Sequence, residues 1–375
     1  MSADRSWASL AIDISPAHLE LVTRAREVVA RAIEPLAHDE SDDGARRMTR
    51  ALGEAGLLDA AVDLDVPGVC FLRDVVASAS GLADSMLALQ GLGFGPIALA
   101  GTPEQRAALA PGVRAGERIA AFALTEPEAG SDVASLSTRA EPDGDGWRIS
   151  GTKRYITNAG IADFYVVFAR TSEDRHRGIS AFIVRAEEIT SVERFELVAP
   201  HPIGEVRFEN VRVPGDRLVG EVGGGFELAM RTLDHFRTTV GAAANGMASR
   251  ALSEALERSK TRRQFGKPIG AFQQIGAHLA DSFVELEAAR LLVHRAAGLF
   301  ARGDAEAGLY SSAAKLYATE AAQRIIDRAV QIFGGDGVRR GTTVERLYRE
   351  IRALRIYEGT TEVQKLVISK ALSRR

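Results

Sequence analysis

The length of the helical repeats after residue 223 is the feature that most restricts how this 375-residue chain folds. After the three consecutive glycines at 223–225, apolar residues recur at three- and four-residue spacing almost to the last residue. The runs cover about 225–260, 269–302 and 305–333, with shorter ones near 342–353 and 360–373. A helix of the first length would be about 54 Å long, which is typical of helix bundles. We therefore predict a C-terminal four-helix bundle domain over residues 223–375.

The residues before this bundle divide into a helical part and a strand part. Helical spacing begins after Ser15-Pro16, a cap followed by a first-turn proline, and continues to residue 117. Short runs rich in Val, Ile, Phe, Tyr and Thr, separated by turn signals, then follow. This predicts an N-terminal all-α domain (1–117) and a middle β domain (118–222) that is barrel-like or a sandwich. Because strands and helices do not alternate, we predict an α+β multidomain fold and no doubly wound parallel sheet.

Composition excludes several classes of function. The chain is 46% hydrophobic and 26% charged with a net charge of −3, so it has neither the composition of a disordered protein nor a basic footprint for nucleic acid. Cys70 is the only cysteine and the seven histidines form no ligand pair, so neither disulfides nor a metal site is expected. We expect no membrane span or signal peptide, and hence a cytoplasmic protein.

A GxGxG pattern at Gly91, Gly93 and Gly95 begins inside the last residues of a predicted helix over 83–92. The pattern has no preceding strand and is followed by Pro96. We therefore expect no dinucleotide-binding turn here.

Two motifs lie in the β segment. In LTEPEAGSD (124–132), the backbone N–H groups of residues 130–132 could face a phosphate or the polar edge of a ring, although a plain turn fits the pattern equally well. In KRYITN (153–158), Tyr155 could stack against a flat heterocycle, or the motif could simply end a strand.

Two further motifs lie in the C-terminal segment. The arginines of TRRQFGKPI (261–269) could clamp a pyrophosphate, or could simply favour the end of a helix dipole. The glycines of QIFGGDGVRR (331–340) permit close approach of a ligand, and RIYEGTTEVQ (355–364) presents Glu358 in a loop between helices.

Taken together and in this order, the motifs resemble those of the acyl-CoA dehydrogenase family of flavoproteins. The resemblance covers about residues 16–373 and rests on six motifs: TEPxAGSD, K-x-aromatic-ITN, F-x-N-V-x-VP (208–214), R-x-x-FGK-x-I (262–269), FGGxG (333–337) and YEGT (357–360). It implies FAD as cofactor and α,β-desaturation of an acyl thioester. Glu358 would abstract the α-proton while a hydride leaves the β-carbon for flavin N5.

The resemblance also implies a set of binding residues. For FAD these are Phe122, Leu124, Thr125, Gly130, Ser131, Tyr155, Ile156, Thr157, Arg262, Gln264, Phe265, Gln273, Gln331, Gly334, Gly335, Thr360 and Glu362, some of them acting across a subunit interface. For the thioester they are Ser131, Asp234, Arg237, Glu358 and Gly359. Asp234 and Arg237 are three residues apart and could equally form a solvated ion pair on one helix face.

The sequence departs from the family pattern in several places. Phe236 occupies the position at which some members carry the base, which leaves Glu358 as the candidate, and Tyr155 stands where Trp is common. The Tyr-Gly-Gly stretch usual near 60–70 and the Gly-x-Arg-x-Ser pattern usual before 205–210 are absent. An acyl-carrier thioester therefore stays open beside acyl-CoA as the substrate.

The expected partners are an electron-transferring flavoprotein and further copies of the chain, in a tetramer or dimer. The alternatives are an acyl-CoA oxidase or flavin monooxygenase on the same fold, or a non-catalytic flavin-binding homologue. Glu358 favours dehydrogenation, because relatives of the monooxygenase type do not need an α-proton base.

Overall fold

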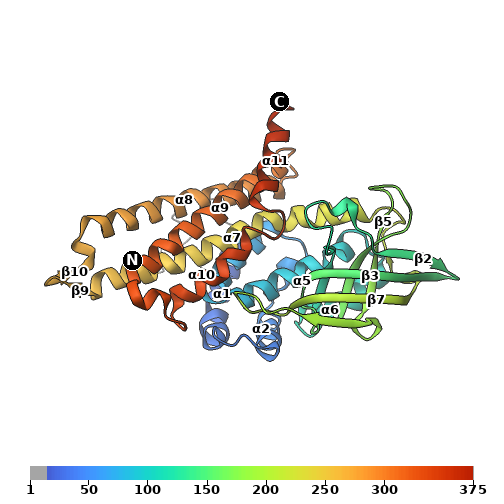
Figure 1. Cartoon of the computed structure of the whole chain (residues 1–375), viewed down its shortest axis with the longest axis horizontal. Coiled ribbons are helices and arrows are strands. Elements are labelled where there is room, and N and C mark those ends of the chain that lie inside the picture. Colours follow the sequence, from blue (N-terminus) through green and yellow to red (C-terminus); the bar gives the residue numbers. More distant parts are fainter. Residues whose placement is uncertain (1–14, 375) are drawn as a thin grey trace. The chain divides into compact units, whose positions relative to one another are not determined.

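The computed structural model describes residues 15–374, which form two compact units drawn from interleaved segments of the chain. The helical unit contains the segment that ends at His38, then Val66–Asp84, and everything from Arg237 onward. The mixed unit contains Asp39–Asp65 and Ser85–Phe236. Figure 1 shows these helices and strands and labels many of them.

The helical unit is built from long helices whose packed faces carry small side chains. Its elements are α1 (Pro16–Val28), η2 (Val29–Ile33), η3 (Glu34–Leu36), α4 (Val66–Ala79), most of α7 (Gly225–Thr261), β9 (Arg263–Gln264), β10 (Lys267–Pro268), η7 (Ile269–Ala271), α8 (Gln273–Ala301), α9 (Ala307–Phe333), η8 (Gly334–Val338), α10 (Thr343–Leu354) and α11 (Thr361–Leu372). Alanines dominate its buried core, so the helix axes can approach closely. At Gly246 a Cβ would lie 2.1 Å from the carbonyl oxygen of Asp74, so α7 and α4 are in backbone contact there.

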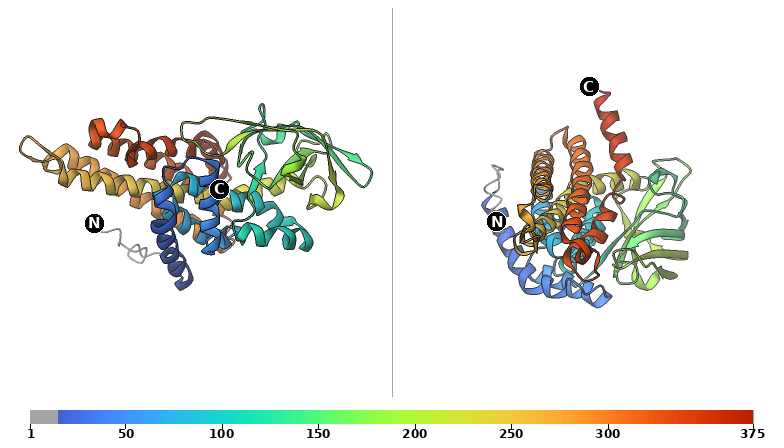
Figure 2. Two further views of the ribbon diagram at one scale, coloured as in Figure 1. Left: turned by 90° about the horizontal axis from the view of Figure 1, so that it is seen from below. Right: turned by 60° about the vertical axis from the view of Figure 1, so that its left-hand side comes forward.

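One helix of this unit stands apart from the others. Figures 1 and 2 show α11 projecting from the bundle, and of its residues only Thr361 and Gln364 are buried. Leu366 on its outer face is 70% exposed.

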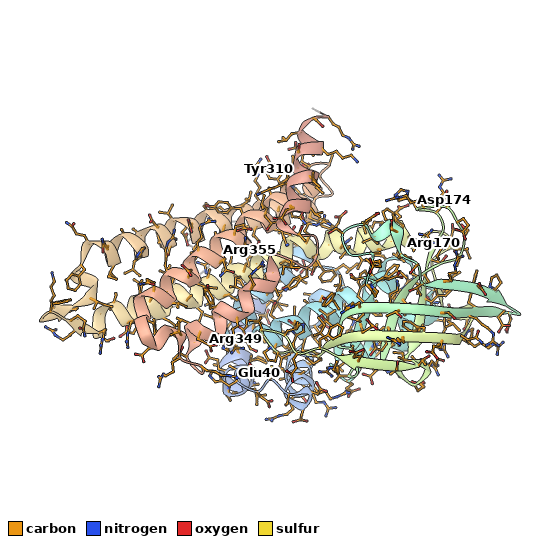
Figure 3. The ribbon with its side chains drawn as sticks, viewed as in Figure 1. Glu40, Arg170, Asp174, Tyr310, Arg349 and Arg355 are labelled. Carbon is orange, nitrogen blue, oxygen red and sulfur yellow. The ribbon has the colours of Figure 1, made fainter. Side chains whose placement is uncertain are left out.

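The mixed unit is a twisted sheet with short helices. Its strands are β1 (Ala120–Ala123), β2 (Arg139–Asp143), β3 (Gly146–Thr157), β4 (Phe164–Arg170), β5 (Ile179–Arg185), β6 (Ser191–Arg194), β7 (Ile203–Pro214) and β8 (Leu218–Val219), in the order β6-β7-β3-β2-β4-β5-β8 with β1 paired parallel to β4. Its helical elements are α2 (Asp42–Glu54), α3 (Asp59–Val62), α6 (Pro103–Arg114), η4 (Val133–Ser135), η5 (Ala186–Glu188) and η6 (Gly215–Arg217). The β4 and β5 strands are buried along almost their whole length. Arg170, the last residue of β4 and labelled in Figure 3, donates to the carbonyl of Asp174 at 2.7 Å.

The helix predicted over 83–92 is longer than expected: α5 runs from Gly81 to Ala100 with Pro96 inside it. Its glycines face neighbouring atoms that leave no room for a side chain. A Cβ at Gly91 would lie 2.4 Å from Phe236 Cζ, and one at Gly93 would lie 2.7 Å from the Ala120 Cβ. Burial therefore outweighs the low helix propensity of glycine, and the GxGxG pattern is a packing surface.

By length and composition α5 could also cross a membrane. Of its most apolar window, 78% is buried inside the structure, which is typical of the core helix of a globular protein.

The predicted fold class is confirmed: a helical N-terminal part precedes a β-sheet part and a helical C-terminal part. The compact units nevertheless cut across the N-terminal helices, because α1 and α4 belong to the unit that also contains α8, α9 and α10. The division into three domains with boundaries at 117/118 and 222/223 stays a prediction.

Candidate active site

A buried ion pair joins the two motifs of the mixed unit. Lys153, on β3, donates from Nζ to Glu126 Oε1 at 2.8 Å and to the Leu124 carbonyl at 3.0 Å. Glu126 also accepts from the backbone N–H groups of Ser137 and Thr138. The loop that carries TEPEAGSD is therefore fixed to the strand that carries KRYITN.

The electrostatics of this pair favour the ionised carboxylate. Burial raises the pKa of Glu126. The Lys153 ammonium and the hydrogen bonds from Thr138 and Ser137 lower the pKa by more than burial raises it, so the net pKa lies below its ordinary value. A buried charge is tolerated where it is paired in this way. Glu126 thus has a structural role in the loop.

The predicted flavin-binding residues of the mixed unit differ in their exposure to solvent. Gly130 and Ser131 are exposed, and a Cβ at Gly130 would meet nothing within 4 Å. Tyr155 is 57% exposed, and its backbone has a left-handed φ of +56°. Its ring contacts the ring of Phe195 edge-on. Three others, Phe122, Leu124 and Ile156, are buried.

The arginine motif forms a projecting arm at one end of the helical unit. The short hairpin β9–β10 carries the exposed Gln264 and, in its turn, Phe265, which is 92% exposed and has a backbone φ of +49°. Arg262, which directly precedes β9, is also exposed. At the base of the arm Arg258 donates to Asp336 Oδ2 at 2.7 Å. This contact brings the base of the arm next to the exposed Gly334, Gly335 and Gln331. Gln273 is exposed at the start of α8.

The glycine turn and the Glu358 loop lie at opposite ends of α10. That helix has 12 residues, which corresponds to about 18 Å. Gly334 and Glu358 of one chain therefore lie about one helix length apart and do not belong to one binding site within the helical unit. The partly buried Thr360 and exposed Glu362 stand beside Glu358 at the start of α11.

The loop that carries Glu358 is held by side chains from two helices. Gln364 of α11 donates from Nε2 to the carbonyls of Glu358 (3.3 Å) and Gly359 (3.0 Å). Lys315 of α9 donates from Nζ to the Gly359 carbonyl at 2.7 Å. Arg355, labelled in Figure 3, donates to Glu320 Oε1 of α9 at 2.9 Å.

The carboxyl group of Glu358 has the properties of a general base. Its Oε2 atom is buried and has no hydrogen-bond partner among the described residues. Burial raises the pKa of Glu358, and the positive charges of Arg73, Lys315 and Arg237 oppose this without cancelling it. A carboxylate with a raised pKa can accept a proton near neutral pH.

A second buried ion pair adjoins this carboxyl group. Arg73 of α4 donates to both oxygens of Asp84, at 2.8 and 2.7 Å, and to Thr239 Oγ1 of α7 at 2.9 Å. Arg73 is also hydrogen-bonded to Tyr357, whose pKa is raised by burial. The charge of Arg73 is the strongest that acts on Glu358.

The remaining predicted thioester residues lie on α7. Asp234 and Arg237 are half-buried, and His235 between them contacts the Arg231 carbonyl through Nδ1 at 2.7 Å.

Sequence reasoning missed the polar side chains that hold these sites. They are Glu126, Lys153, Arg73, Asp84 and Lys315, and all five are buried. For Lys315 a signal was present, since a lone lysine in the small-residue run SSAAKLYA predicts a buried cation with a dedicated partner.

Comparison with known proteins shows the family of the chain. Three family models match in order: acyl-CoA dehydrogenase N-terminal domain (residues 15–117), middle domain (121–211) and C-terminal domain (223–373). The chain therefore belongs to the acyl-CoA dehydrogenase family and is an oxidoreductase of that family.

Individual relatives cover most of the chain. The probable acyl-CoA dehydrogenase FadE25 of Mycobacterium tuberculosis is 41% identical over 83% of this chain and 81% of its own length. The caffeyl-CoA reductase–Etf complex subunit CarC of Acetobacterium woodii is 42% identical over 79% of each chain. Among solved structures, butyryl-CoA dehydrogenase from Megasphaera elsdenii has a TM-score of 0.90 at 32% identity, covering 96% of this chain and 99% of its own.

FAD is the cofactor, as in the FAD complex of the acyl-CoA dehydrogenase from Bacillus anthracis, which has a TM-score of 0.90 at 28% identity and covers 96% of this chain and 68% of that one. The residues present fit a flavin nucleotide. The positions beside Gly130, Gly334 and Gly335 have open space where a Cβ would stand, and Arg262 offers a guanidinium suited to phosphate.

Proposed function

We propose that this protein is an FAD-dependent acyl-CoA dehydrogenase that converts an acyl thioester to its 2-enoyl form. The observation that carries the proposal is Glu358: a carboxyl group with a buried, unpartnered oxygen and a pKa raised by burial, in the YEGT motif. An acyl chain that displaces water there would raise the proton affinity of the carboxylate further.

In this proposal each group of residues has its own role in the reaction. Glu358 Oε2 takes the α-proton, and the backbone N–H of Glu358 donates to the thioester carbonyl as enolate character develops. Bound FAD supplies the hydride acceptor. The loops around Gly130 and Tyr155 hold the flavin ring, Thr125, Ser131 and Thr157 contact its edge, and Asp234 and Arg237 contact the thioester.

The proposed partners follow from the surface and from the relatives. Phe265 and Leu366 are large apolar residues exposed at 92% and 70%, which favours a homo-oligomer in which the arm completes the flavin site of another subunit. We infer an electron-transferring flavoprotein as electron acceptor, since one relative is a subunit of an Etf complex. We infer a cytoplasmic location.

A second candidate is the reverse reaction, reduction of an enoyl thioester. It is favoured by the relatives named caffeyl-CoA reductase subunit and 3-(aryl)acrylate reductase. The same Glu358 would then return a proton to the α-carbon.

The decisive experiment mixes the FAD-loaded protein anaerobically with acyl thioesters of varied length, branching and ring content while the flavin absorbance is followed. Bleaching by a saturated thioester supports dehydrogenation. If no thioester reduces the flavin, but an enoyl thioester reoxidises the chemically reduced flavin, the reductase candidate is supported instead.

Glu358→Gln tests the base. FAD should stay bound while the rate of reduction falls by about 10³-fold or more, because the general base is removed. Glu257→Gln, which neutralises an exposed glutamate on α7, is the matched control and should reduce at the wild-type rate. Unimpaired reduction in Glu358→Gln would show that the base lies elsewhere.

A further inference from the structure

The side chain of Lys315 ends beside the proposed base without binding its carboxylate. Lys315 is fully buried on α9, and its Nζ donates to the carbonyl of Gly359, the residue next to Glu358. The buried Oε2 of Glu358 still has no hydrogen-bond partner among the described residues. The contact therefore fixes the backbone of the loop and leaves this oxygen available.

The backbone of this loop needs such a restraint. Glu358 and Gly359 both have left-handed φ angles, +53° and +90°. A non-glycine residue in this region costs about 1–3 kcal/mol and persists only where its surroundings hold it. Lys315 from α9 and Gln364 from α11 both donate to the Gly359 carbonyl, so two helices hold the same atom.

The charges around Lys315 and Glu358 act on both groups. Burial lowers the pKa of Lys315 to about 8, and Glu358 is the acidic group that most strongly opposes this shift, with smaller contributions from Glu320 and Glu362. In turn Lys315 lowers the pKa of Glu358, alongside Arg73. Arg237 from α7 acts in the same direction on both groups, and Asp84 from α5 acts against it on Glu358.

We infer that Lys315 is a positioning residue for Glu358: it holds the Gly359 carbonyl, and its ammonium group places a positive charge near the carboxylate without occupying the oxygen that takes the proton. The inference rests on the proposed function, because it assigns the proton transfer to Glu358. A purely structural lysine would affect folding, but neither the proton affinity of Glu358 nor the reaction step at saturating thioester.

Two substitutions separate the roles of the charge and the hydrogen bond. Lys315→Gln removes the charge and keeps an N–H donor, whereas Lys315→Met removes both. Lys315→Arg keeps both. Arg324→Met is the matched control, since it removes a cation from the same helix, where Arg324 pairs with Glu285 of α8.

The first measurement needs no substrate. The infrared band of the protonated Glu358 carboxyl group, assigned by its loss in Glu358→Gln, is followed against pH in the FAD-loaded protein. Loss of the positive charge should raise the pKa of Glu358 by about one unit in Lys315→Gln and Lys315→Met, and leave it unchanged in Arg324→Met.

The second measurement is flavin reduction by a thioester that reduces the wild-type protein. At saturating thioester the rate should fall about 10-fold in Lys315→Gln and further in Lys315→Met, while the apparent Kd of the thioester changes less than about 3-fold. The rising limb of the rate against pH should move to higher pH in both variants. Lys315→Arg should recover the rate to within about 5-fold of wild type.

The outcomes distinguish this inference from the proposed function. Should the Lys315 variants match Arg324→Met in both the infrared pKa and the reduction rate, the inference is overturned even if Glu358→Gln is inactive. Should Glu358→Gln reduce normally, the proposed base is wrong, whatever the Lys315 variants do. Where Lys315→Met does not fold, Lys315→Gln carries the comparison.

Discussion

Arg73 and Asp84 face each other in a bidentate ion pair that solvent does not reach, with N–O distances of 2.8 and 2.7 Å and both side chains almost wholly buried. The pair joins α4 to the first turn of α5 and adjoins the loop that carries Glu358. A buried pair of this kind is destabilising when broken on one side only, because the remaining charge stays in the interior.

Asp84→Asn should therefore lower the free energy of unfolding by about 3–5 kcal/mol, measured by urea denaturation. The double variant Arg73→Met with Asp84→Leu removes both charges and should lose less stability than Asp84→Asn, because no charge of the pair is left alone in the interior. Arg114→Met is the control, since it breaks a part-exposed ion pair with Asp63 and should cost less than about 1 kcal/mol. Equal losses in Asp84→Asn and Arg114→Met would contradict the prediction.

Gly359→Ala should disturb the loop of the proposed base. Gly359 has φ of +90°, and an added Cβ would lie 2.4 Å from Gln364 Nε2, so both backbone strain and a clash arise. We expect a loss of about 1–3 kcal/mol in the free energy of unfolding and a flavin reduction rate at least about 10-fold lower. Gly303→Ala is the matched control: its φ is +64° with nothing within 4 Å, so it should show strain alone and reduce flavin normally.

The Glu126–Lys153 pair predicts acid sensitivity of the mixed unit. The folded-state pKa of Glu126 lies below its ordinary value of 4.5. Its stabilisation is therefore fully present above that value and is lost as pH falls through the folded-state pKa, by at most about 1.4 kcal/mol per pH unit. Urea midpoints between about pH 6 and about pH 3 should fall more steeply for wild type than for Glu126→Gln with Lys153→Met. If the urea midpoints of the two proteins fell equally steeply with pH, the Glu126–Lys153 pair would not be a source of acid sensitivity.

Phe265→Ser tests whether the arm acts between subunits. The ring is 92% exposed and lies at the tip of a hairpin, so its loss should change the free energy of unfolding by no more than about 0.5 kcal/mol. Sedimentation should show smaller assemblies, and the FAD content of the purified protein should fall. Val222→Ser, which replaces another exposed apolar residue, should change neither quantity. Unchanged mass and FAD content in Phe265→Ser would place the arm outside the interface.

What could be predicted from the sequence depended on whether the signal was local. Helical period, strand composition and the six motifs are local, and they predicted the order of helical and β parts and the position of Glu358 in a loop. The end of α5 was missed because its glycines are helical only where Phe236 and Ala120 pack against them. Lys153 and Lys315 were missed for the same reason, since each finds its partner through a contact distant in sequence.

The interleaving of the two units has a consequence for biosynthesis. The chain passes from one unit to the other at residues 38/39, 65/66, 84/85 and 236/237. Helices α1 and α4 leave the ribosome early, yet α4 packs against α8, which is made roughly 200 residues later. The face of α4 that packs against α8 therefore stays uncovered until α8 has been made, although α1 can already pack against α4, and the helical unit can close only after the ribosome has released the C-terminal bundle.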